Sequence, residues 1–446
     1  MSIFHSLVDG LLLVSSVFVL VGSIFLSFRL RFVQLRLFPK LFKGFFNSLK
    51  RNSDEEGEHT VLPHRALFAS MSTTLGISTI VAPVIAIHVG GPGALIGFLL
   101  TAFFGSAATF VEVDLSVRYR EKFKDGSISG GPMPYLRRHL SPKFASFYAI
   151  GAMMLMMAWS GAQANQLAAI LSSPLLGSFT IPKVVSGIVI ALLVTKALLG
   201  GIKWIGRFSA KLVPVMFTLY LGSSLWILAA NYDRLFGVFA EILRCAIEPH
   251  AIVGGAAVGG LVSSLRWGIF KGMQATEAGI GMQAIPHSLS ETEDATAQAT
   301  LAMLSSYTAG FVAFVSGCVS MVTGTWADNS LPLGISMVAA SFHQYFSTFG
   351  VVVVTVSTLL FGFGTILGNS FNGGQCFRYL AAGKKKSLFY IFTAVLIVVG
   401  AMADAKAFWS YIDICLAAIA VPHMAALVLS VKKERVPTLL ATKMEA

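Results

Sequence analysis

Eleven apolar runs follow one another along the 446 residues of this chain, and most are about as long as a helix that crosses a lipid bilayer. The runs lie near residues 9–28, 66–88, 93–117, 145–168, 181–199, 212–230, 251–270, 297–324, 348–370, 387–403 and 408–430. Inside hydrocarbon, the backbone N–H and C=O groups of a spanning segment must be paired internally. The sequence therefore predicts an all-α polytopic membrane protein of about 11 transmembrane helices.

Composition supports a membrane protein and argues against nucleic acid, a metal site or a cofactor. Only 12% of the residues are charged, whereas soluble domains carry roughly 25%. The net charge of +12 does not indicate nucleic acid, because 29 of the 33 Lys and Arg residues fall in segments that share one side if the N-terminus is outside. We then expect a cytoplasmic C-terminus and a chain integral to the plasma (inner) membrane. The four cysteines form no metal-ligand pattern, and no cofactor is expected.

The second apolar run contains a stretch, residues 70–94, that a plain membrane anchor would not need. Six hydroxyl residues crowd its first half, and Gly76 and Pro83 interrupt a regular helix. A break inside the hydrocarbon is tolerated where the freed backbone groups are buried in protein or line a cavity, as they do at transporter sites. Two interpretations stay open: a binding site at the break, or a kinked packing helix whose hydroxyls bond back to carbonyls one turn earlier.

A glycine-rich stretch in the seventh run resembles this arrangement. Gly254, Gly255, Gly259 and Gly260 each cost a helix roughly 1 kcal/mol relative to alanine, so either close packing or a second break must explain them. The seventh run stands five positions after the second, so two broken helices would occupy matching places in two five-helix repeats, the second of them inverted. We expect an N-terminal helix and basic interfacial segment (1–65), two inverted repeats (66–250 and 251–430) and a cytoplasmic tail (431–446).

Several strings, in their order and spacing, resemble the alanine or glycine:cation symporter family of the amino acid/polyamine/organocation superfamily. The strings are GGPGA at 90–94, Glu112 with VRYRE at 117–121, GGPMPY at 130–135, QAN at 163–165, GGIKWIG at 200–206 with KLVP at 211–214, RWGIF and TEAGIGMQAIPH within 266–287, and TILG at 365–368 with Tyr379. The resemblance covers nearly the whole chain. It implies a five-plus-five inverted-repeat core that imports small neutral amino acids with a cation, usually sodium.

The chain also departs from the usual residues of that family. The differences are GIST at 76–79 for GTGN, Gly364 for a threonine, Asn369 for a tryptophan, Thr276 for an asparagine and Ala309 for an aspartate. Sodium prefers several hard oxygen ligands, so a lost hydroxyl weakens a sodium site unless Ser78, Thr79 or water replaces it. Proton-coupled or uncoupled transport is therefore the alternative to sodium symport.

The resemblance further implies which residues form the site. Gln163 would contact the amino acid, because an amide donates to a carboxylate and accepts from an ammonium group; the alternative is a helix-to-helix hydrogen bond worth roughly 1 kcal/mol. The other residues expected to bind substrate are Ser78, Thr79, Gly255, Gly259 and Gly260. The expected cation ligands are Thr365 and the backbone around Gly76.

Three further residues are candidates for gating or coupling. Glu112 and Glu277 lie near the expected inner ends of their helices, where they would form gate salt bridges, stay solvated or hold a loop in place. His88 lies at the outer end of the first broken helix, where it would couple protons or simply bond a neighbour.

A membrane enzyme and a channel fit the sequence less well. The chain offers no Ser-His-Asp or metal-ligand spacing and no phosphate-binding G-x-x-x-x-G-K-[ST] loop. A channel would want a continuous polar pore lining, which two broken helices do not provide. The chain is therefore expected to be a secondary transporter and not an enzyme.

Overall fold

The structure is a computed structural model that describes residues 2–52, 56–123, 126–173, 180–247, 251–253, 256–258, 261–383, 386–403 and 405–433. The first half of the chain forms α1 (Ser2–Arg29), α2 (Val33–Arg36), α3 (Phe38–Leu49), α4 (Pro63–Thr74), α5 (Ile77–Gly90), α6 (Ala94–Arg118), β1 (Glu121–Lys122), β2 (Ile128–Ser129), α7 (Pro132–His139), α8 (Pro142–Leu171), α9 (Lys183–Leu199), α10 (Gly201–Ala230) and α11 (Tyr232–Ile247). The second half forms β3 (Ala251–Val253), β4 (Ala256–Val258), α12 (Leu261–Thr276), α13 (Ala284–Ser288), α14 (Ala295–Thr323), the 3₁₀ turn η3 (Thr325–Ala327), α15 (Ile335–Leu380), α16 (Lys386–Met402) and α17 (Ala405–Lys433). As predicted, the protein is a helical bundle.

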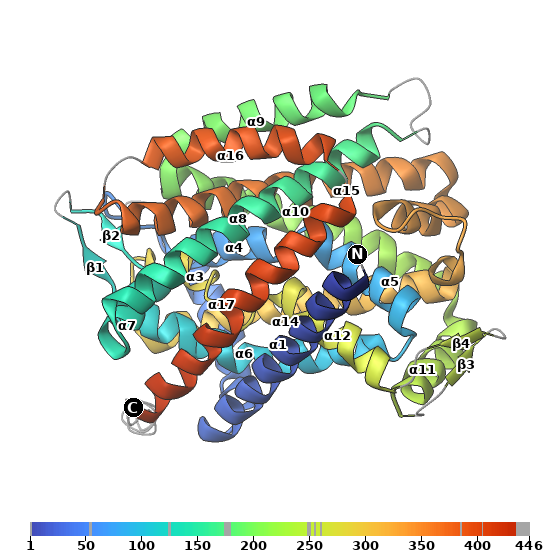
Figure 1. Ribbon diagram of the computed structural model, residues 1–446, viewed down its shortest axis with the longest axis horizontal. Coiled ribbons are helices and arrows are strands. Elements are labelled where there is room, and N and C mark those ends of the chain that lie inside the picture. Colours follow the sequence, from blue (N-terminus) through green and yellow to red (C-terminus); the bar gives the residue numbers. More distant parts are fainter. Residues whose placement is uncertain are drawn as a thin grey trace.

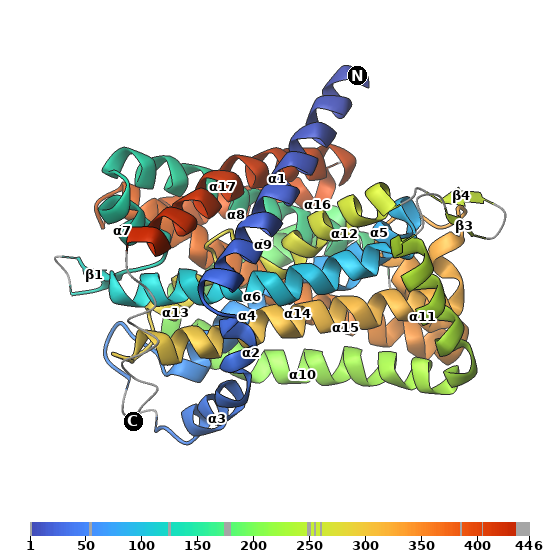
Figure 2. The same ribbon diagram turned by 90° about the horizontal axis from the view of Figure 1, so that it is seen from below.

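The long helices lie side by side, and short elements cover the two ends of the bundle (Figure 1). Helix α6 packs against α12 and α14, α15 packs against α8, and α1 packs against α17. The α11 helix and the β3–β4 hairpin lie at one end, whereas α7 and the strands β1 and β2 lie at the opposite end (Figure 2). We call these the α11 end and the α7 end.

Membrane-spanning length agrees with most of the predicted runs. Seven described helices are long and apolar enough to cross a bilayer, and the pair α4 and α5, bent by about 40°, makes an eighth span. Two other predicted runs form α9 and α16, of 17 residues each, whereas the run at 251–270 reaches only the first part of α12, which has 16 residues. These three helices are close to the lower limit for a span. The predicted run at 348–370 belongs to α15, in which Ser347 has a φ of 51° and separates two helical parts.

The predicted break in the second apolar run is present. Helix α4 ends at Thr74 and α5 begins at Ile77, with Gly76 in an extended conformation (φ −99°, ψ −177°). Pro83 does not end the helix, because α5 continues through it to Gly90. The interruption therefore lies at Leu75 and Gly76, directly after the run of hydroxyl residues.

The structure has a second interruption at a place that the sequence did not predict. Residues 251–253 and 256–258 pair as strands and α12 begins at Leu261, while the four glycines of the predicted break lie outside the described residues. The interruption follows α12, at residues 277–283, where Glu277, Gly279 and Gly281 have φ values of 51°, 80° and 92°. Glycine reaches such angles freely, whereas a glutamate there is strained by about 1–3 kcal/mol.

Two amphipathic helices lie beside the bundle. The basic segment at 31–46 forms α2 and most of α3, and α3 exposes Phe38, Phe42 and Phe46 next to its lysines, as expected of a helix at a membrane interface. The second amphipathic helix, α11, leaves Tyr232 and Phe236 exposed and was not predicted.

Candidate functional site

The first break is surrounded by side chains from its own helices and from α8. The backbone N–H of Ile77, which opens α5, donates to Oε1 of Gln163 on α8 at 3.2 Å. The hydroxyl of Thr79 donates across the break to the carbonyl of Thr74 at 2.7 Å. Backbone groups that helix formation would otherwise satisfy are thus paired by an amide and a hydroxyl. The predicted substrate residues Gln163 and Thr79 therefore meet at the break.

Gly76 lets α8 and α15 approach the break closely. A Cβ atom at Gly76 would lie 2.7 Å from Oγ1 of Thr365 and 3.2 Å from Nε2 of Gln163. The Thr365 hydroxyl in turn donates to the carbonyl of Ser72 at 3.1 Å. The structure therefore brings together three predicted residues, Gly76, Gln163 and Thr365, from three separate helices. Their juxtaposition creates a polar centre in an otherwise apolar bundle.

Three of the six crowded hydroxyls near this break bond within their own helix. Ser72, Thr73 and Thr74 donate to carbonyls three or four residues earlier, at 2.9, 2.6 and 3.1 Å. This is the local bonding that the packing alternative predicted. Ser78 is half-buried on the first turn of α5. The stretch is thus both a true break and a set of back-bonded hydroxyls.

The second break is held by side chains from distant helices. The Tyr148 hydroxyl donates to the carbonyl of Ile280 at 2.5 Å, and Nδ2 of Asn372 donates to the carbonyl of Met282 at 3.4 Å. His423 Nδ1 lies 2.8 Å from the carbonyl of Gly279, so Nδ1 carries the proton there. Because these contacts come from α8, α15 and α17, a change in this loop is felt by three helices.

Glu112 lies beneath the second break and not at a solvated helix end. Its side chain is fully buried on α6 and faces the backbone N–H groups of Gly279 and Gly281. The Glu112 Oε1 atom lies 3.8 Å from Nδ1 of His423, and neither carboxyl oxygen makes a hydrogen bond of ordinary geometry within the described residues. Of the alternatives for Glu112, a solvated carboxylate is therefore excluded, whereas one that holds a loop in place agrees with this geometry. No cation pairs with it in the part of the chain that the structure describes.

Glu277 and His88, the other candidates for gating or coupling, lie apart. Glu277 is also buried, at the start of the second break, and its carboxyl group meets the Thr73 hydroxyl. The solvated alternative is thus wrong for Glu277 as well. His88 Nδ1 lies 2.7 Å from the carbonyl of Trp326 and joins α5 to η3, which is the plain neighbour contact that one interpretation expected.

The predicted substrate glycines Gly255, Gly259 and Gly260, together with Gly254, lie outside the described residues. Sequence reasoning also missed several residues that hold the second break. These are Tyr135, Tyr148, Gln283, Asn372 and His423. They are far apart in the sequence, and the available signal was the Gly279-x-Gly281 pair, which marks a loop that needs partners.

Asn369 is a buried polar residue near the site whose side chain is unsatisfied. It is 1% exposed on α15, and neither its Oδ1 nor its Nδ2 atom has a hydrogen-bond partner among the residues that the structure describes. An unpaired buried polar group costs about 1–3 kcal/mol. The sequence showed Asn369 only as a departure from a family pattern.

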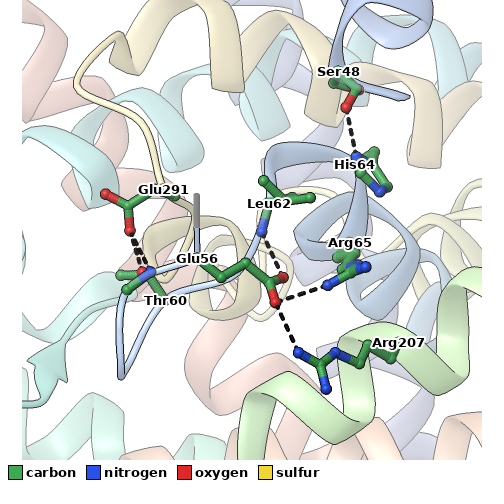
Figure 3. A network of polar contacts seen from close by, with 9 residues as sticks. Ser48, Glu56, Thr60, Leu62, His64, Arg65, Arg207 and Glu291 are labelled. Carbon is green, nitrogen blue, oxygen red and sulfur yellow. Dashed lines mark hydrogen bonds and ion pairs between the residues drawn. The ribbon is translucent and has the colours of Figure 1, made fainter. Parts of the chain in front are cut away.

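A polar network at the base of α4 joins the helices on the α7 side of the two breaks (Figure 3). The Glu56 carboxylate accepts from Leu62 N–H at 3.1 Å and pairs with Arg65 at 2.7 Å and Arg207 at 3.4 Å. Although partial burial raises the pKa of Glu56, the Leu62 N–H and the Arg65 guanidinium outweigh it, and the net pKa is lowered. This network ties α4 to α10.

Backbone contacts extend the same network to the segment that follows the second break. Val61 N–H donates to the carbonyl of Leu289 at 3.0 Å, and Glu291 N–H donates to the carbonyl of Val61 at 2.7 Å. Thr60 donates to the Glu291 carboxylate (Figure 3). Arg120 donates to the carbonyls of Ser288, Ser290 and Thr292. The segments flanking the two breaks are therefore locked together.

Comparison with known proteins places these features in a family. The sequence matches the sodium:alanine symporter family over residues 2–437. It is 30% identical over 416 residues to the sodium/alanine symporter AgcS of Methanococcus maripaludis, covering 91% of this chain and 89% of the relative. It is 25% identical over 410 residues to the probable sodium/glutamine symporter GlnT of Bacillus subtilis, covering 91% and 83% of the two chains.

The fold has a counterpart among solved structures. The Eremococcus coleocola manganese transporter, crystallised with an aromatic bis-isothiourea compound, aligns with a TM-score of 0.52 at 14% identity, over 85% of this chain and 78% of that one. At that identity the likeness concerns the fold alone. The family match, the apolar spans and the broken helix agree with one another, and the chain belongs to the sodium:alanine symporter family of membrane transporters.

Proposed function

We propose that this protein imports small neutral amino acids, alanine and glycine among them, together with sodium. The observation that carries the proposal is the meeting of Gly76, Gln163 and Thr365 at the first break, where a backbone N–H and two polar side chains converge inside the bundle. An amino acid needs donors for its carboxylate and acceptors for its ammonium group, and this centre offers both. Membership of the family supports the amino acid as substrate.

Each residue has a definite role in the proposal. The N-terminus of α5, with Gln163 and Ser78, would hold the carboxylate, because a helix N-terminus carries free N–H groups and the positive end of its dipole. Thr365 and the carbonyls that end α4 would hold the sodium ion, since both present hard oxygen atoms. In the structure, Gln163 and Thr365 bond to backbone groups at and beside the break.

The remaining topology follows from the same proposal. Eleven spans, with α4 to α10 as one inverted repeat and α12 to α17 as the other, would place both breaks near the membrane midplane. The α7 end would face the cytoplasm, because the basic loops of the chain lie at that end and basic loops mark the cytoplasmic side. Alternating access would then open the base of α4, where Glu56, Arg65 and Arg207 now close it.

The alternative within the same fold is coupling to protons or to no ion. It is supported by Gly364, which leaves Thr365 as the single threonine before ILG, and by the buried carboxyl group of Glu112, which has no cationic partner in the described part of the chain. The ion is therefore a matter for direct measurement.

Substrate exchange tests the proposal without reference to the ion. Liposomes that hold the purified full-length protein are loaded with unlabelled alanine, and the entry of labelled alanine is followed. We expect exchange that unlabelled alanine or glycine inhibits and that protein-free liposomes lack. If the protein exchanged none of the neutral amino acids, the proposed substrate class would be contradicted.

A further inference from the structure

Helix α15 passes both breaks with one face. Thr365 on this helix contacts the carbonyl of Ser72 beside the first break, at 3.1 Å, and Asn372 contacts the carbonyl of Met282 in the second break, at 3.4 Å. Asn369 stands four residues after Thr365 and three before Asn372, so the three side chains share one helix face. Asn369 therefore lies between the two contacts.

The surroundings of Asn369 are tightly packed but give its amide nothing to bond. A Cβ atom at the preceding Gly368 would lie 2.2 Å from Cγ2 of Thr73, which shows how closely α15 lies on α4. The Asn369 side chain is 1% exposed and is unpartnered within the described residues. Asn165 on α8 is a useful contrast, because its Nδ2 donates to the carbonyls of Gly400 and Ala403 at 3.0 and 2.9 Å.

An amide in this position is suited to a polar, uncharged ligand. It offers one carbonyl acceptor and two N–H donors, and no charged residue is needed to complement it. A hydroxyl group or a second amide can satisfy both functions at once, whereas a methyl group satisfies neither.

We propose that Asn369 contacts the substrate side chain and makes this transporter favour neutral amino acids that carry a hydroxyl or an amide, such as serine and glutamine. The inference rests on the proposed function and deepens it, because it names the substrate class of the same site. Alanine still binds through its backbone groups at the first break. The polar side chain adds one hydrogen bond with Asn369.

The test compares wild-type protein with Asn369→Leu, which keeps the approximate size of the side chain and removes its polar atoms. For each protein, the measured quantity is the concentration of unlabelled serine, glutamine or alanine that half-inhibits the exchange of labelled alanine in liposomes. In wild-type protein we expect serine or glutamine to inhibit at lower concentrations than alanine. In Asn369→Leu we expect that preference to fall about tenfold, the effect of one lost hydrogen bond, while half-inhibition by alanine changes less than about threefold.

The matched control is Ser370→Ala on the next residue of α15. The Ser370 hydroxyl donates to the carbonyl of Ile366 at 2.6 Å within the helix, so its removal is expected to leave the serine-to-alanine ratio unchanged. If the serine-to-alanine ratio in Asn369→Leu stayed within about threefold of wild type, the inference would be overturned. The proposed function would still hold in that case, because alanine exchange would persist. Absence of exchange in wild-type protein would instead overturn the proposed function and the inference together.

Thermal unfolding supplies a second readout that does not depend on transport. Without substrate, Asn369→Leu is expected to unfold at the wild-type temperature or above it, because an unpartnered amide is removed. Added serine is expected to raise the unfolding temperature of wild-type protein more than that of the variant. A variant that fails to fold, or one that unfolds well below wild type, would show that Asn369 is a structural residue and would also overturn the inference.

Discussion

The two breaks solve the same problem with different chemistry. The first break spans only Leu75 and Gly76 and is satisfied by Thr79 of its own chain segment and by one amide from α8, Gln163. The second break spans residues 277–283, contains three positive φ angles and is held by aromatic hydroxyl, imidazole and amide groups from distant helices. In the proposed function, Gln163 and Thr365 at the short break would exchange their backbone partners for ligands. The long break is more rigidly anchored.

This difference predicts that changes at the second break damage folding, whereas changes at the first break damage transport. The largest effect is expected for Gly281→Ala. Its new methyl group would lie 2.5 Å from the Tyr148 hydroxyl and 2.6 Å from Cγ of Pro132, at a φ of 92°. Overpacking and left-handed strain together cost about 3 kcal/mol, so we expect a much lower yield of monodisperse protein in gel filtration.

Gly126→Ala is the control for Gly281→Ala. Gly126 also has a positive φ, of 77°, but a Cβ atom there would meet nothing within 4 Å. Its methyl group therefore adds strain of only about 1 kcal/mol and is expected to leave the yield nearly unchanged. Equal yields of the two variants would contradict the close packing of the second break.

At the first break we expect Gln163→Ala to abolish uptake while the protein still inserts and folds. The variant loses the amide that would hold the substrate and, in the empty state, one hydrogen bond of about 1 kcal/mol to Ile77. Uptake into liposomes and the elution profile are measured on the same preparation. Gln166→Ala, three residues along α8, serves as control and is expected to transport normally. Normal transport by Gln163→Ala would remove Gln163 from the site.

A smaller and ion-specific effect is expected from Thr365→Val. The variant keeps the shape of the side chain but loses the hydroxyl oxygen next to Ser72, so the sodium concentration that gives half-maximal uptake should rise about tenfold. Alanine exchange at saturating sodium should change much less. Thr358→Val on the same helix is the control, because the Thr358 hydroxyl bonds only to the carbonyl of Val354, at 2.6 Å. An unchanged sodium dependence would place the ion elsewhere.

The smallest effect concerns the network at the base of α4 and depends on pH. The pKa of Glu56 is lowered from 4.5 in the folded protein, so its contribution to stability is complete above about pH 4.5 and is lost as the pH falls through the lowered value. We expect the unfolding temperature of wild-type protein to fall more than that of Glu56→Gln over this acidic range. Parallel curves for the two proteins would show that the ion pairs do not stabilise the closed base.

The first break could be predicted from the sequence because its signals are local. Hydroxyl residues, Gly76 and an apolar run occur within a few residues of one another, and the resemblance to a family added Gln163 and Thr365. The same reasoning overlooked the interruption at 277–283, because four glycines at 254–260, which lie outside the described residues, drew attention from Gly279 and Gly281. Glycine density alone therefore does not locate an interruption in a helix.

The partners of the second break could not be predicted because no sequence pattern joins them. Tyr148 and His423 are 275 positions apart, and their rings come together only after α8 and α17 pack. Glu112 was expected near a solvated helix end, since hydropathy shows where a run stops but not which face meets a loop. The burial of Glu112 follows from the tertiary packing of α6 against that loop.

Accumulation of alanine against its gradient is the most direct test of sodium symport by this protein. Liposomes with the purified full-length protein are given labelled alanine with an inward sodium gradient, with an inward proton gradient, or with neither. Sodium symport predicts that alanine accumulates above the external concentration with the sodium gradient. This accumulation should be lost when the sodium gradient is collapsed. Accumulation with protons alone, or mere equilibration under all three conditions, would contradict sodium symport through Thr365 and the first break.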